Sequence, residues 1–413
     1  MEGIRAMHIV YVTSEFVTEK EYGGLAVYLN NISNIMSRHG HKVTIVTLSE
    51  CEGELLYKKD IDVIRVKRTP LEPLKDDLYA AISMLENSWK LFSVLKKVKK
   101  SRRVDLVQSA NYQAVGFFRD YQVPTIVRVS SDSSLWRNAA DVKFDYEMAL
   151  KQKKFGDIAE LMCVRHADAA YAPSVFGARA IAKRSGRKLD VIESPFVECD
   201  LELDDSLYKE RLEGKKYLLF NSALSSLKGT HLGIEAADYI LNRYPVLNLV
   251  YAGNDGGLRQ VNGGCQNIAG ILQRQAHQYN GRVIYLGRLE HKKLYPIIQN
   301  SLACVLPSRV DNLPNACIEA MSQGKIVIGT YGASFEQLIK NKQNGLLIQR
   351  DSRNALIKAV NYLMELSEQE REQMGMKAEE TVIRLQPEEI YKLIIEYYLN
   401  VIDKFAKKGR LLK

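Results

Sequence analysis

The chain has 413 residues, enough for two or three domains, and its 46% hydrophobic and 26% charged residues are typical of a globular protein. No apolar stretch approaches the roughly 20 residues needed to span a bilayer. The six cysteines are scattered without a C-x-x-C pair, which argues against a disulfide framework or a zinc site. The net charge of +9 favours anionic partners such as phosphorylated ligands or acidic lipid surfaces.

The N-terminal stretch, MEGIRAMHIVYV, contains no long apolar segment followed by a small-residue cleavage site. It is therefore not predicted to be a signal peptide. Dispersed cysteines favour reduced thiols, so we expect a cytoplasmic protein.

Short β-branched runs alternate with amphipathic stretches along the chain. Between the first two runs, Leu25, Leu29, Ile32 and Met36 recur at helical spacing, and this helix is expected to end at residues 39–40. Alternating strands and helices imply parallel sheets with right-handed crossovers, and two such series imply two doubly wound domains. The predicted strands are 7–12, 42–47, 62–67, 105–110, 124–129, 167–172 and 189–194, then 216–221, 247–253, 282–287, 302–308, 325–330 and 345–348.

The stretch 311–324, DNLPNACIEAMSQG, places two carboxylates, Asp311 and Glu319, across a loop and a helix start. Residues 312–315 are predicted to form a loop, and the sequence is predicted to be helical from Ala316 onward. The N–H groups of a helix N-terminus bind anions, and a carboxylate just inside the turn can hold sugar or ribose hydroxyls. This pattern favours a ligand that joins phosphate to a polyol, such as a nucleotide sugar. The alternative is an ordinary strand–loop–helix connection with solvated acids.

This segment resembles the E-x7-E signature of the retaining GT-B glycosyltransferases of family 4, the group 1 glycosyltransferases. There a proline–serine strand end leads to a carboxylate, an asparagine, a proline and an EAM-x-x-G helix. One departure is that Asp311 stands where the family usually has glutamate, which keeps the charge but shortens the reach. The resemblance is carried by Pro307, Ser308, Asn312, Pro314, Glu319, Ala320, Met321 and Gly324, then by VIG at 327–329 and the run ending at Glu336.

The resemblance covers essentially the whole chain and implies the GT-B fold, in which two Rossmann-like α/β domains with doubly wound parallel sheets face each other across a cleft. The expected domains are an acceptor-binding domain at 1–198 and a nucleotide-sugar-binding domain at 199–386. The acidic stretch 197–214 marks their boundary. Residues 387–413 are predicted to form a helix that packs back on the first domain. Because open α/β sheets bind ligands at the carboxyl ends of their strands, we expect the site in the cleft.

A pair of glycines, Gly23-Gly24, lies between the first strand and the first helix. Glycine lets the backbone approach a phosphate, and the helix N-terminus favours an anion. In the resembled family such a loop faces the donor diphosphate and the acceptor, whereas elsewhere a Gly-Gly pair is often only a turn.

Lys228-Gly229 matches the lysine–glycine of the family, whose lysine pairs with the donor pyrophosphate and stabilises the leaving nucleotide. The family normally adds an arginine five residues earlier, where this chain has Ala223. Arg288 and Arg309 are the candidate substitutes. The alternative for the lysine is a solvated surface side chain.

Ser130 stands where the family often has a histidine, after the predicted strand 124–129. Retaining transfer in this fold does not need a strong general base, because the departing phosphate can accept the proton of the acceptor. Ser130, Ser131 and Asp132 could therefore hydrogen-bond the sugar or the acceptor, and Asp132 could act as the base of an inverting reaction. The alternative is a helix-capping cluster before Leu135.

No cluster of histidine, cysteine and carboxylate residues has metal-ligand spacing, and the resemblance implies a transfer reaction that requires no metal or other cofactor. Asp60 and Asp62 form a D-x-D, but among neighbouring lysines they are expected to be a solvated pair. Glu160 and Asp168 match a glutamate and an aspartate of the family that we interpret as fold markers.

The segment 84–103 is predicted to be a basic amphipathic helix. It could lie on an anionic membrane surface, as in relatives that use lipid-linked acceptors, or pack its apolar face into the core. Nucleic acid is not expected as a partner, because the basic run lacks interleaved aromatic residues or a recognisable module. The apolar face comprises Met84, Ser88, Leu91, Leu95 and Val98, and the basic end comprises Lys96, Lys97, Lys99, Lys100, Arg102 and Arg103.

The resemblance implies a retaining, hexosyltransferase-like enzyme that moves a sugar from a nucleotide diphosphate sugar to a hydroxyl of a carbohydrate, lipid-linked or small-molecule acceptor. Cell-surface polysaccharide or glycolipid synthesis, at the inner face of the membrane, is the expected setting. Its expected site residues are Glu319 for the donor ribose, Asp311 with Asn312, Leu313, Pro314 and Asn315 for the donor sugar and phosphate, Lys228 for the diphosphate, Gly23 and Gly24 for the close loop, and Ser130 for the sugar or acceptor.

Two other functions remain open. Ala223 and the missing histidine suggest a catalytically impaired pseudoenzyme that binds nucleotide sugar or serves as a partner subunit. A nucleotide-sugar epimerase would share the fold, but the E-x7-E-like run disfavours it.

Overall fold

The computed structural model divides into two compact units. Unit 1 comprises Met1–Ser134, Gln152–Val197 and Leu385–Lys413, and unit 2 comprises Leu135–Lys151 and Glu198–Arg384. Unit 2 also includes residues 135–139, which lie within the stretch 1–198 expected from the sequence for the first domain. The structure describes residues 5–20, 23–70, 77–130, 132–139, 154–198, 202–259 and 265–411.

Unit 1 is built on an eight-stranded sheet with the order β3-β4-β2-β1-β5-β6-β7-β8. Neighbouring strands pair in parallel except β3 and β4, which are antiparallel. Strand order reverses between β1 and β5, so this pair forms the topological switch point of a doubly wound sheet. The strands are β1 His8–Thr13, β2 Lys42–Ser49, β3 Gly53–Lys58, β4 Ile61–Lys67, β5 Leu106–Ala110, β6 Thr125–Arg128, β7 Ala169–Ala172 and β8 Asp190–Val191.

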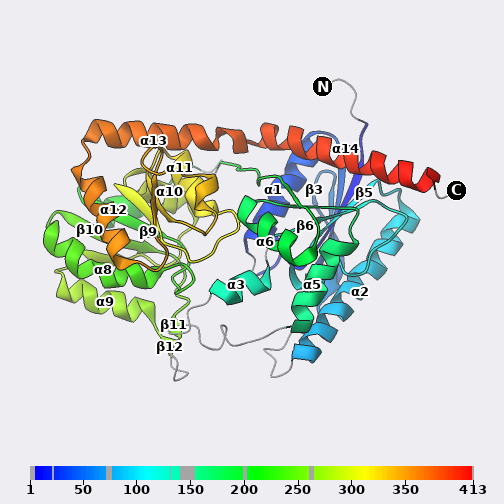
Figure 1. Ribbon diagram of the computed structural model, residues 1–413, viewed down its shortest axis with the longest axis horizontal. Helices are drawn as coiled ribbons and strands as arrows, with labels where there is room; N and C mark the ends of the chain where they lie inside the picture. Colours follow the sequence, from blue (N-terminus) through cyan, green and yellow to red (C-terminus); the bar gives the residue numbers. More distant parts are fainter. Residues whose placement is uncertain are drawn as a thin grey trace. The chain divides into compact units, whose positions relative to one another are not determined.

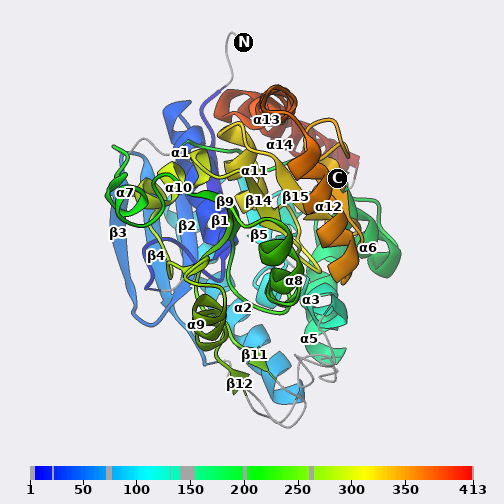
Figure 2. The same ribbon diagram turned by 90° about the vertical axis from the view of Figure 1, so that its left-hand side faces the viewer.

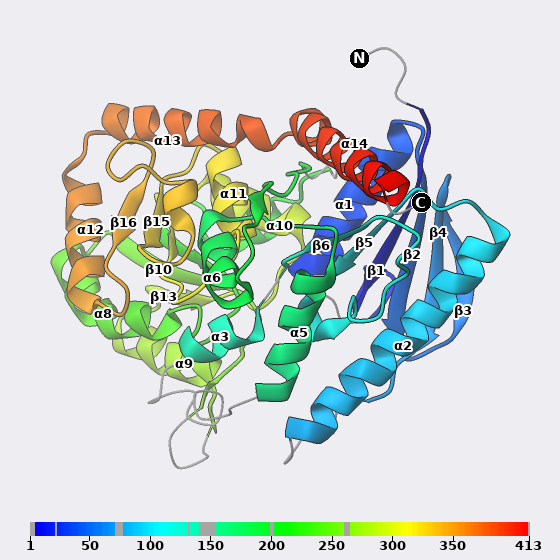
Figure 3. The same ribbon diagram turned by 45° about the vertical axis from the view of Figure 1, so that its right-hand side comes forward.

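Helices cover both faces of the unit 1 sheet, because alternate residues of its buried strands point to opposite sides. Ile9 and Tyr11 of β1 join one core with α1 and α14, whereas Val10 and Val12 join a second core with α2. Figure 3 shows α2 and α5 together on the side of this second core. The helices are α1 Gly24–Arg38, α2 Asp77–Ser101, η1 Tyr112–Ala114, α3 Ser133–Ala139, which ends in unit 2, α5 Lys154–His166, α6 Val175–Ser185 and α14 Pro387–Leu411.

The helix α14 completes the core of unit 1, beside α1 (Figure 1). The Tyr398 hydroxyl is fully buried and donates to Gln108 Oε1 at 2.6 Å. Gln108 Oε1 also accepts from the Tyr171 hydroxyl at 2.8 Å, and the Tyr171 and Tyr28 hydroxyls lie 2.8 Å apart. These contacts join residues from both ends of the described chain into one buried polar network.

Unit 2 is built on a six-stranded parallel sheet with the order β13-β10-β9-β14-β15-β16. Its switch point lies between β9 and β14. A separate antiparallel pair, β11 and β12, follows β10. The strands are β9 Lys216–Asn221, β10 Leu247–Ala252, β11 Leu258–Arg259, β12 Cys265–Gln266, β13 Val283–Tyr285, β14 Ala303–Leu306, β15 Val327–Thr330 and β16 Leu346–Ile348.

The core of unit 2 lies between its sheet and the helices α8, α9 and α12. Figure 2 shows α8 and α12 side by side. Among the described residues, no helix is long and apolar enough to cross a bilayer. The helices of unit 2 are α7 Ser206–Arg211, α8 Thr230–Arg243, α9 Ile268–Gln278, α10 His291–Gln299, α11 Asn315–Ser322, η2 Phe335–Gln337, α12 Arg353–Glu365, α13 Glu368–Val382 and η3 Ile383–Leu385.

The expectation of two doubly wound α/β sheets is confirmed, and each predicted strand overlaps an observed one. The predicted strand 189–194 is shorter, because β8 is an edge strand paired only with β7. Three strands are not predicted: β3, whose exposed residues lack a strong apolar pattern, and β11 and β12, which have only two residues each.

Candidate active site

Two loops of unit 2 leave the sheet at the carboxyl ends of β9 and β14, which are paired neighbours at the switch point. The first loop carries Lys228 and the second carries Asp311. Lys228 Nζ lies 2.5 Å from Asp311 Oδ2, and the two side chains are 22% and 14% exposed. The ring of Trp136, in the part of α3 that groups with unit 2, lies 5.6 Å from the same ammonium. The ammonium is thus held against an internal carboxylate.

Gly229 allows these two loops to approach each other. Its φ is +71°, in the left-handed region, and a Cβ at this position would lie 2.0 Å from the carbonyl oxygen of Pro307. The Arg309 N–H donates to the Leu227 carbonyl at 2.8 Å, which joins the loops next to this contact. A side chain at residue 229 would therefore push the Lys228 loop away from the end of β14.

The segment 312–315 connects Asp311 to α11. Asn312 N–H donates to Asp311 Oδ1 at 3.2 Å, and the Ser334 hydroxyl donates to the Asp311 carbonyl at 2.9 Å. Leu313 is buried, so only its backbone is available to a ligand. Pro314 is the N-cap of α11 and supplies no side-chain hydrogen bond, so no side chain caps the helix from that position.

Glu319 lies on α11 and is paired with a residue that the sequence motif does not contain. His291 Nε2, at the start of α10, lies 3.4 Å from Glu319 Oε1. The hydrogen bond to Glu319 raises the pKa of His291 above its ordinary value, against the opposing effect of burial. No sequence signal pointed to His291, because nothing in its own segment resembles a functional motif.

The two candidate substitutes for the missing arginine are placed differently. Arg309 is largely buried, and its guanidinium pairs with Asp351 at 3.2 Å and donates to the Ala139 carbonyl at 2.7 Å. Arg288 is exposed in the loop after β13. The structure therefore leaves Arg288 more accessible to an anion than Arg309.

In unit 1 the N-terminus of α1 is occupied by a carboxylate from the same chain. Glu15 Oε1 accepts the Gly23 N–H at 3.1 Å and the Ala26 N–H at 3.2 Å. Gly23 has a φ of −115°, and Gly24 is the first residue of α1. The Glu15 carboxylate lies where the sequence pattern predicts a ligand phosphate. The sequence feature that could have indicated this contact is a carboxylate eight residues before Gly23.

Ser130 follows β6 and is held by its neighbours. Its N–H donates to Asn111 Oδ1 at 3.1 Å, and its hydroxyl oxygen accepts from Arg128 Nη1 at 2.8 Å. Arg128 also donates to the Ser194 hydroxyl at 2.8 Å. Ser131 lies outside the described residues.

Asp132 is committed to internal contacts. Its side chain is 4% exposed, and its Oδ2 pairs with Arg184 Nη1 at 2.6 Å. Its Oδ1 accepts the hydroxyl of Ser134. This arrangement favours the structural interpretation of the Ser/Asp cluster over a catalytic base.

Glu160 of α5 is buried at the same edge of the unit 1 sheet and holds two loops. Its Oε1 accepts the Gln113 N–H at 3.1 Å and the Ser133 hydroxyl at 2.8 Å. Gln113 and Ala114 have φ of 56° and 54°, a conformation that costs energy in residues with a Cβ. Burial and the nearby Asp132 charge raise the pKa of Glu160 to about 7, while the hydrogen bonds oppose them.

The described residues contain no group of three or more histidines, cysteines and carboxylates able to hold a metal ion. The D-x-D pair does not form one, because Asp62 is paired with Arg102 and lies 3.7 Å from Lys42. Asp60 forms a turn, with a φ of 62°.

Comparison with known families identifies both parts of the chain. Residues 206–381 match the model of the glycosyl transferases group 1, and residues 23–193 match that of the glycosyl transferase 4-like domain. No curated protein sequence matches the chain.

The chain is also similar in structure to solved proteins. Sucrose-phosphate synthase from Thermosynechococcus elongatus is 17% identical over 96% of this chain and all of that chain, with a TM-score of 0.76. HepE of Anabaena, solved with UDP and glucose, is 16% identical over 95% of this chain and all of that one, with a TM-score of 0.68. A trehalose-6-phosphate protein of Escherichia coli, solved with UDP-2-fluoro glucose, is 12% identical over 95% of this chain and 98% of that one, with a TM-score of 0.70.

Two parallel-sheet α/β units with these neighbours define a protein of the GT-B fold. The two family models lie one in each half of the chain. The second half of the chain matches the group 1 glycosyltransferases, and the first half matches the glycosyl transferase 4-like domain.

Proposed function

We propose that this chain transfers a sugar from a nucleotide diphosphate sugar to an acceptor hydroxyl. The observation that carries the proposal is the Lys228–Asp311 pair at the switch point of unit 2, beside α11 with Glu319. The lysine already holds an anionic oxygen, so a donor diphosphate can replace the carboxylate as its partner. Asp311 then becomes available to the donor sugar, and Glu319 to the ribose hydroxyls. HepE and the Escherichia coli protein, with their UDP and UDP-sugar ligands, support this type of donor.

The proposed transfer proceeds with retention of the anomeric configuration. An inverting reaction needs a carboxylate or histidine base beside the acceptor. In unit 1, Asp132 is paired with Arg184, Glu160 is buried and Glu15 holds the N-terminus of α1. The leaving phosphate is therefore the proposed proton acceptor, and Ser130 is proposed to hydrogen-bond the sugar or acceptor. No metal or other cofactor enters this scheme.

Arg288 is the proposed second cation for the diphosphate. It would replace the arginine of the family, whose position in this chain is occupied by Ala223. Gly253 N–H donates to the Gly287 carbonyl at 2.8 Å, and a Cβ on Gly253 would lie 1.9 Å from the Ser222 carbonyl oxygen. These contacts join the loops after β9, β10 and β13. Gly287, directly before Arg288, and Ser222, directly before Ala223, thus both contact Gly253 at the carboxyl ends of the unit 2 strands.

The test is to measure binding and hydrolysis of a panel of UDP-, GDP-, ADP- and CDP-sugars, with the Glu319→Ala variant as control. The expected result is one donor that binds and slowly releases nucleotide, with both properties lost in the variant. The anomeric configuration of the transferred sugar, read by NMR, tests retention. Binding of no donor would contradict the proposed site.

The alternative is a pseudoenzyme that binds nucleotide sugar without turning it over. Ala223 is the observation that favours it, because one of two diphosphate cations is absent from its usual position. Tight donor binding without hydrolysis or transfer, even with broad acceptor mixtures, would support this alternative. Release of free nucleotide would also exclude a simple epimerase.

Membrane association through α2 is a further part of the proposed setting, in which the acceptor is a lipid-linked or polysaccharide precursor. The apolar face expected from the sequence is buried in the core, so that face is not available to lipid. The exposed side chains of α2 include Ile82 and Trp89, with Lys96, Lys97 and Lys100 toward the helix end; Leu78, Tyr79 and the acidic Glu86 are exposed as well. The apolar and basic residues favour a peripheral contact with an anionic surface.

Sedimentation with vesicles of phosphatidylcholine and phosphatidylglycerol tests this contact. The variant Lys96→Gln/Lys97→Gln/Lys100→Gln should bind vesicles about 10²-fold more weakly, because each of the three basic residues near an anionic surface contributes about 1 kcal/mol. A matched variant at Lys215, Lys358 and Lys377, exposed lysines of unit 2, should bind like the wild type. Equal binding by both variants would exclude α2 as the contact.

A further inference from the structure

A cavity of about 740 Å³ lies in unit 1, at the amino ends of β7 and β8, between these strands and α14. Its walls include Ala167 to Ala170 at the start of β7 and Arg187 and Lys188 just before β8. Ser130 follows the carboxyl end of β6, so the cavity lies at the opposite edge of the same sheet. Its volume is in the range of small-molecule sites.

The walls of this cavity are strongly basic. They carry six cationic side chains, namely Arg119, Arg165, Arg187, Lys188, Lys404 and Lys408. Only two carboxylates, Asp168 and Asp190, line the same space among the described residues.

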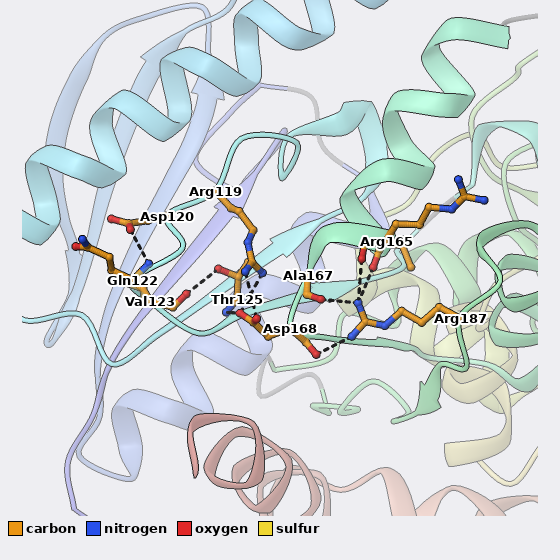
Figure 4. A network of polar contacts seen from close by, with 10 residues as sticks. Arg119, Asp120, Gln122, Val123, Thr125, Arg165, Ala167, Asp168 and Arg187 are labelled. Carbon is orange, nitrogen blue, oxygen red and sulfur yellow. Dashed lines mark hydrogen bonds and ion pairs between the residues drawn. The ribbon is translucent and has the colours of Figure 1, made fainter. Parts of the chain in front are cut away.

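One of the two carboxylates is fully engaged (Figure 4). Asp168 receives two hydrogen bonds from Arg119, at 3.0 and 3.2 Å, and a third from the Thr125 N–H at 2.9 Å. Arg119 is 9% exposed, and its buried Nε–H has no hydrogen-bond partner. An unsatisfied buried donor at a cavity wall costs free energy unless a ligand or water accepts its hydrogen.

Two other arginines are oriented by backbone carbonyls, and no carboxylate in the described part of the chain forms an ion pair with them. Arg187 donates to the carbonyl of Val164 in α5. It also donates to the carbonyl of Asp168, directly before β7 (Figure 4). Arg165 donates to the carbonyl of Ser185 at 3.0 Å. Carbonyl dipoles fix the guanidinium groups but leave their net charges uncompensated.

The remaining positive charge comes from exposed lysines around the opening. Tyr397, Val401, Lys404 and Lys408 line the cavity and recur at the spacing of one helical face, so α14 directs two ammonium groups toward it. Lys188 is exposed on the other side. Asn400 and Asp190 also line the cavity and can hydrogen-bond hydroxyls.

We infer that this cavity binds a phosphate ester of a polyol, at a site separate from the donor site of unit 2. Fixed guanidinium groups and mobile lysines suit a phosphate, and the amide and carboxylate suit neighbouring hydroxyls. A free phosphorylated metabolite and the headgroup of an anionic phospholipid share this chemistry. The inference does not depend on the proposed transferase activity.

The test follows hydrogen exchange by mass spectrometry on the full chain, with two probes added separately. Inorganic pyrophosphate represents the free phosphates, and vesicles of phosphatidylcholine with phosphatidylglycerol represent the headgroups. Phosphatidylcholine vesicles alone are the control. Peptides covering 184–190 and 397–408 report the cavity, and peptides covering 225–230 and 309–319 report the donor site.

The variant Lys188→Gln/Lys404→Gln/Lys408→Gln removes three charges from the cavity. The matched control, Lys183→Gln/Lys392→Gln/Lys407→Gln, removes three exposed charges that do not line it. We expect a probe to protect the cavity peptides in the wild type and the control, with about tenfold weaker binding in the cavity variant. Hydrogen exchange of peptides from the buried strands β1 and β2, equal to that of the wild type without any probe, verifies that the cavity variant is folded.

Protection by vesicles but not by pyrophosphate would identify the ligand as a membrane headgroup, and the reverse would identify a free phosphate. Protection of the cavity peptides by pyrophosphate without protection of the donor-site peptides would leave this inference standing and contradict the proposed donor site. The inference is overturned if neither probe protects the cavity peptides, or if the cavity variant responds like the control.

Discussion

The carboxyl edges of the two sheets use their carboxylates in opposite ways. In unit 2, Asp311 and Glu319 are partly exposed and each is paired with one cationic or titratable side chain. In unit 1, Glu15 and Glu160 are bonded to backbone N–H groups of the loops around them. The unit 2 carboxylates can exchange partners with a ligand, whereas the unit 1 carboxylates hold the loops in place. The difference supports the proposal that the donor binds in unit 2.

The largest effect is expected from Lys228→Ala. Loss of the ammonium removes the charge that stabilises the departing diphosphate, so kcat for donor hydrolysis or transfer should fall about 10²- to 10³-fold. Lys358→Ala, at an exposed lysine of α12, is the matched control and should keep wild-type activity. A fall in kcat of less than tenfold in a folded Lys228 variant would show that Lys228 does not stabilise the negative charge of the departing diphosphate.

The next largest difference is expected between two glycines at helix N-termini, Gly229 in unit 2 and Gly23 in unit 1, when each is replaced by alanine. Gly229→Ala combines a φ of +71° with a contact of 2.0 Å to a backbone oxygen, so the free energy of unfolding should fall by at least about 3 kcal/mol. Gly23→Ala has an accessible φ, and its Cβ would meet only the end of the Glu15 side chain at 3.2 Å, so the loss should stay under about 1 kcal/mol. Urea unfolding measures both, and equal losses would remove the distinction.

The pH dependence of stability tests the role of Glu160. Its pKa is about 7 in the folded chain and ordinarily 4.5, so the native state retains a proton that the unfolded state releases between these values. Stability contributed by the protonated group is therefore lost as pH rises from 4.5 to 7, by about 3 kcal/mol. In Glu160→Gln, urea unfolding across this range should lack that loss. An unchanged pH profile would contradict the raised pKa.

The smallest effect concerns His291, whose pKa is raised by Glu319. The charged imidazole stabilises the fold below its unfolded pKa of 6.5, and this contribution is lost as pH rises through the higher folded value. NMR titration should show that Glu319→Gln lowers the His291 pKa, with less than about 1 kcal/mol of change in stability because the pair is at the surface. The proposal also predicts that bound nucleotide lowers this pKa, because the ribose would compete for Glu319.

Most of the strands could be predicted because buried parallel strands are continuous apolar runs. Strand β10, Leu247–Ala252, is buried throughout and was evident, whereas β3 is exposed at the sheet edge and was not. The predicted helix between the first two strands matches α1, Gly24–Arg38, because its apolar residues recur along one face.

The candidate site was predictable only where its residues share one motif. Asp311 and Glu319 belong to a single run, and Lys228 stands at a recognisable lysine–glycine. The pairing of His291 with Glu319, and of Arg184 with Asp132, depends on elements that the fold brings together from distant segments. Local periodicity contains no information on such contacts.

The position of α14 in unit 1 bears on the order of events during synthesis. Tyr398 bonds to Gln108, which precedes it by 290 residues, with all of unit 2 between them. At a translation rate of roughly 5 to 20 residues per second, the partner helix emerges about 15 to 60 seconds later. Until then α1 alone covers the sheet face with Ile9, Tyr11 and Tyr171, and the part of it that α14 will cover is exposed to chaperones and to aggregation. The unit that the ribosome begins first is the one that it completes last.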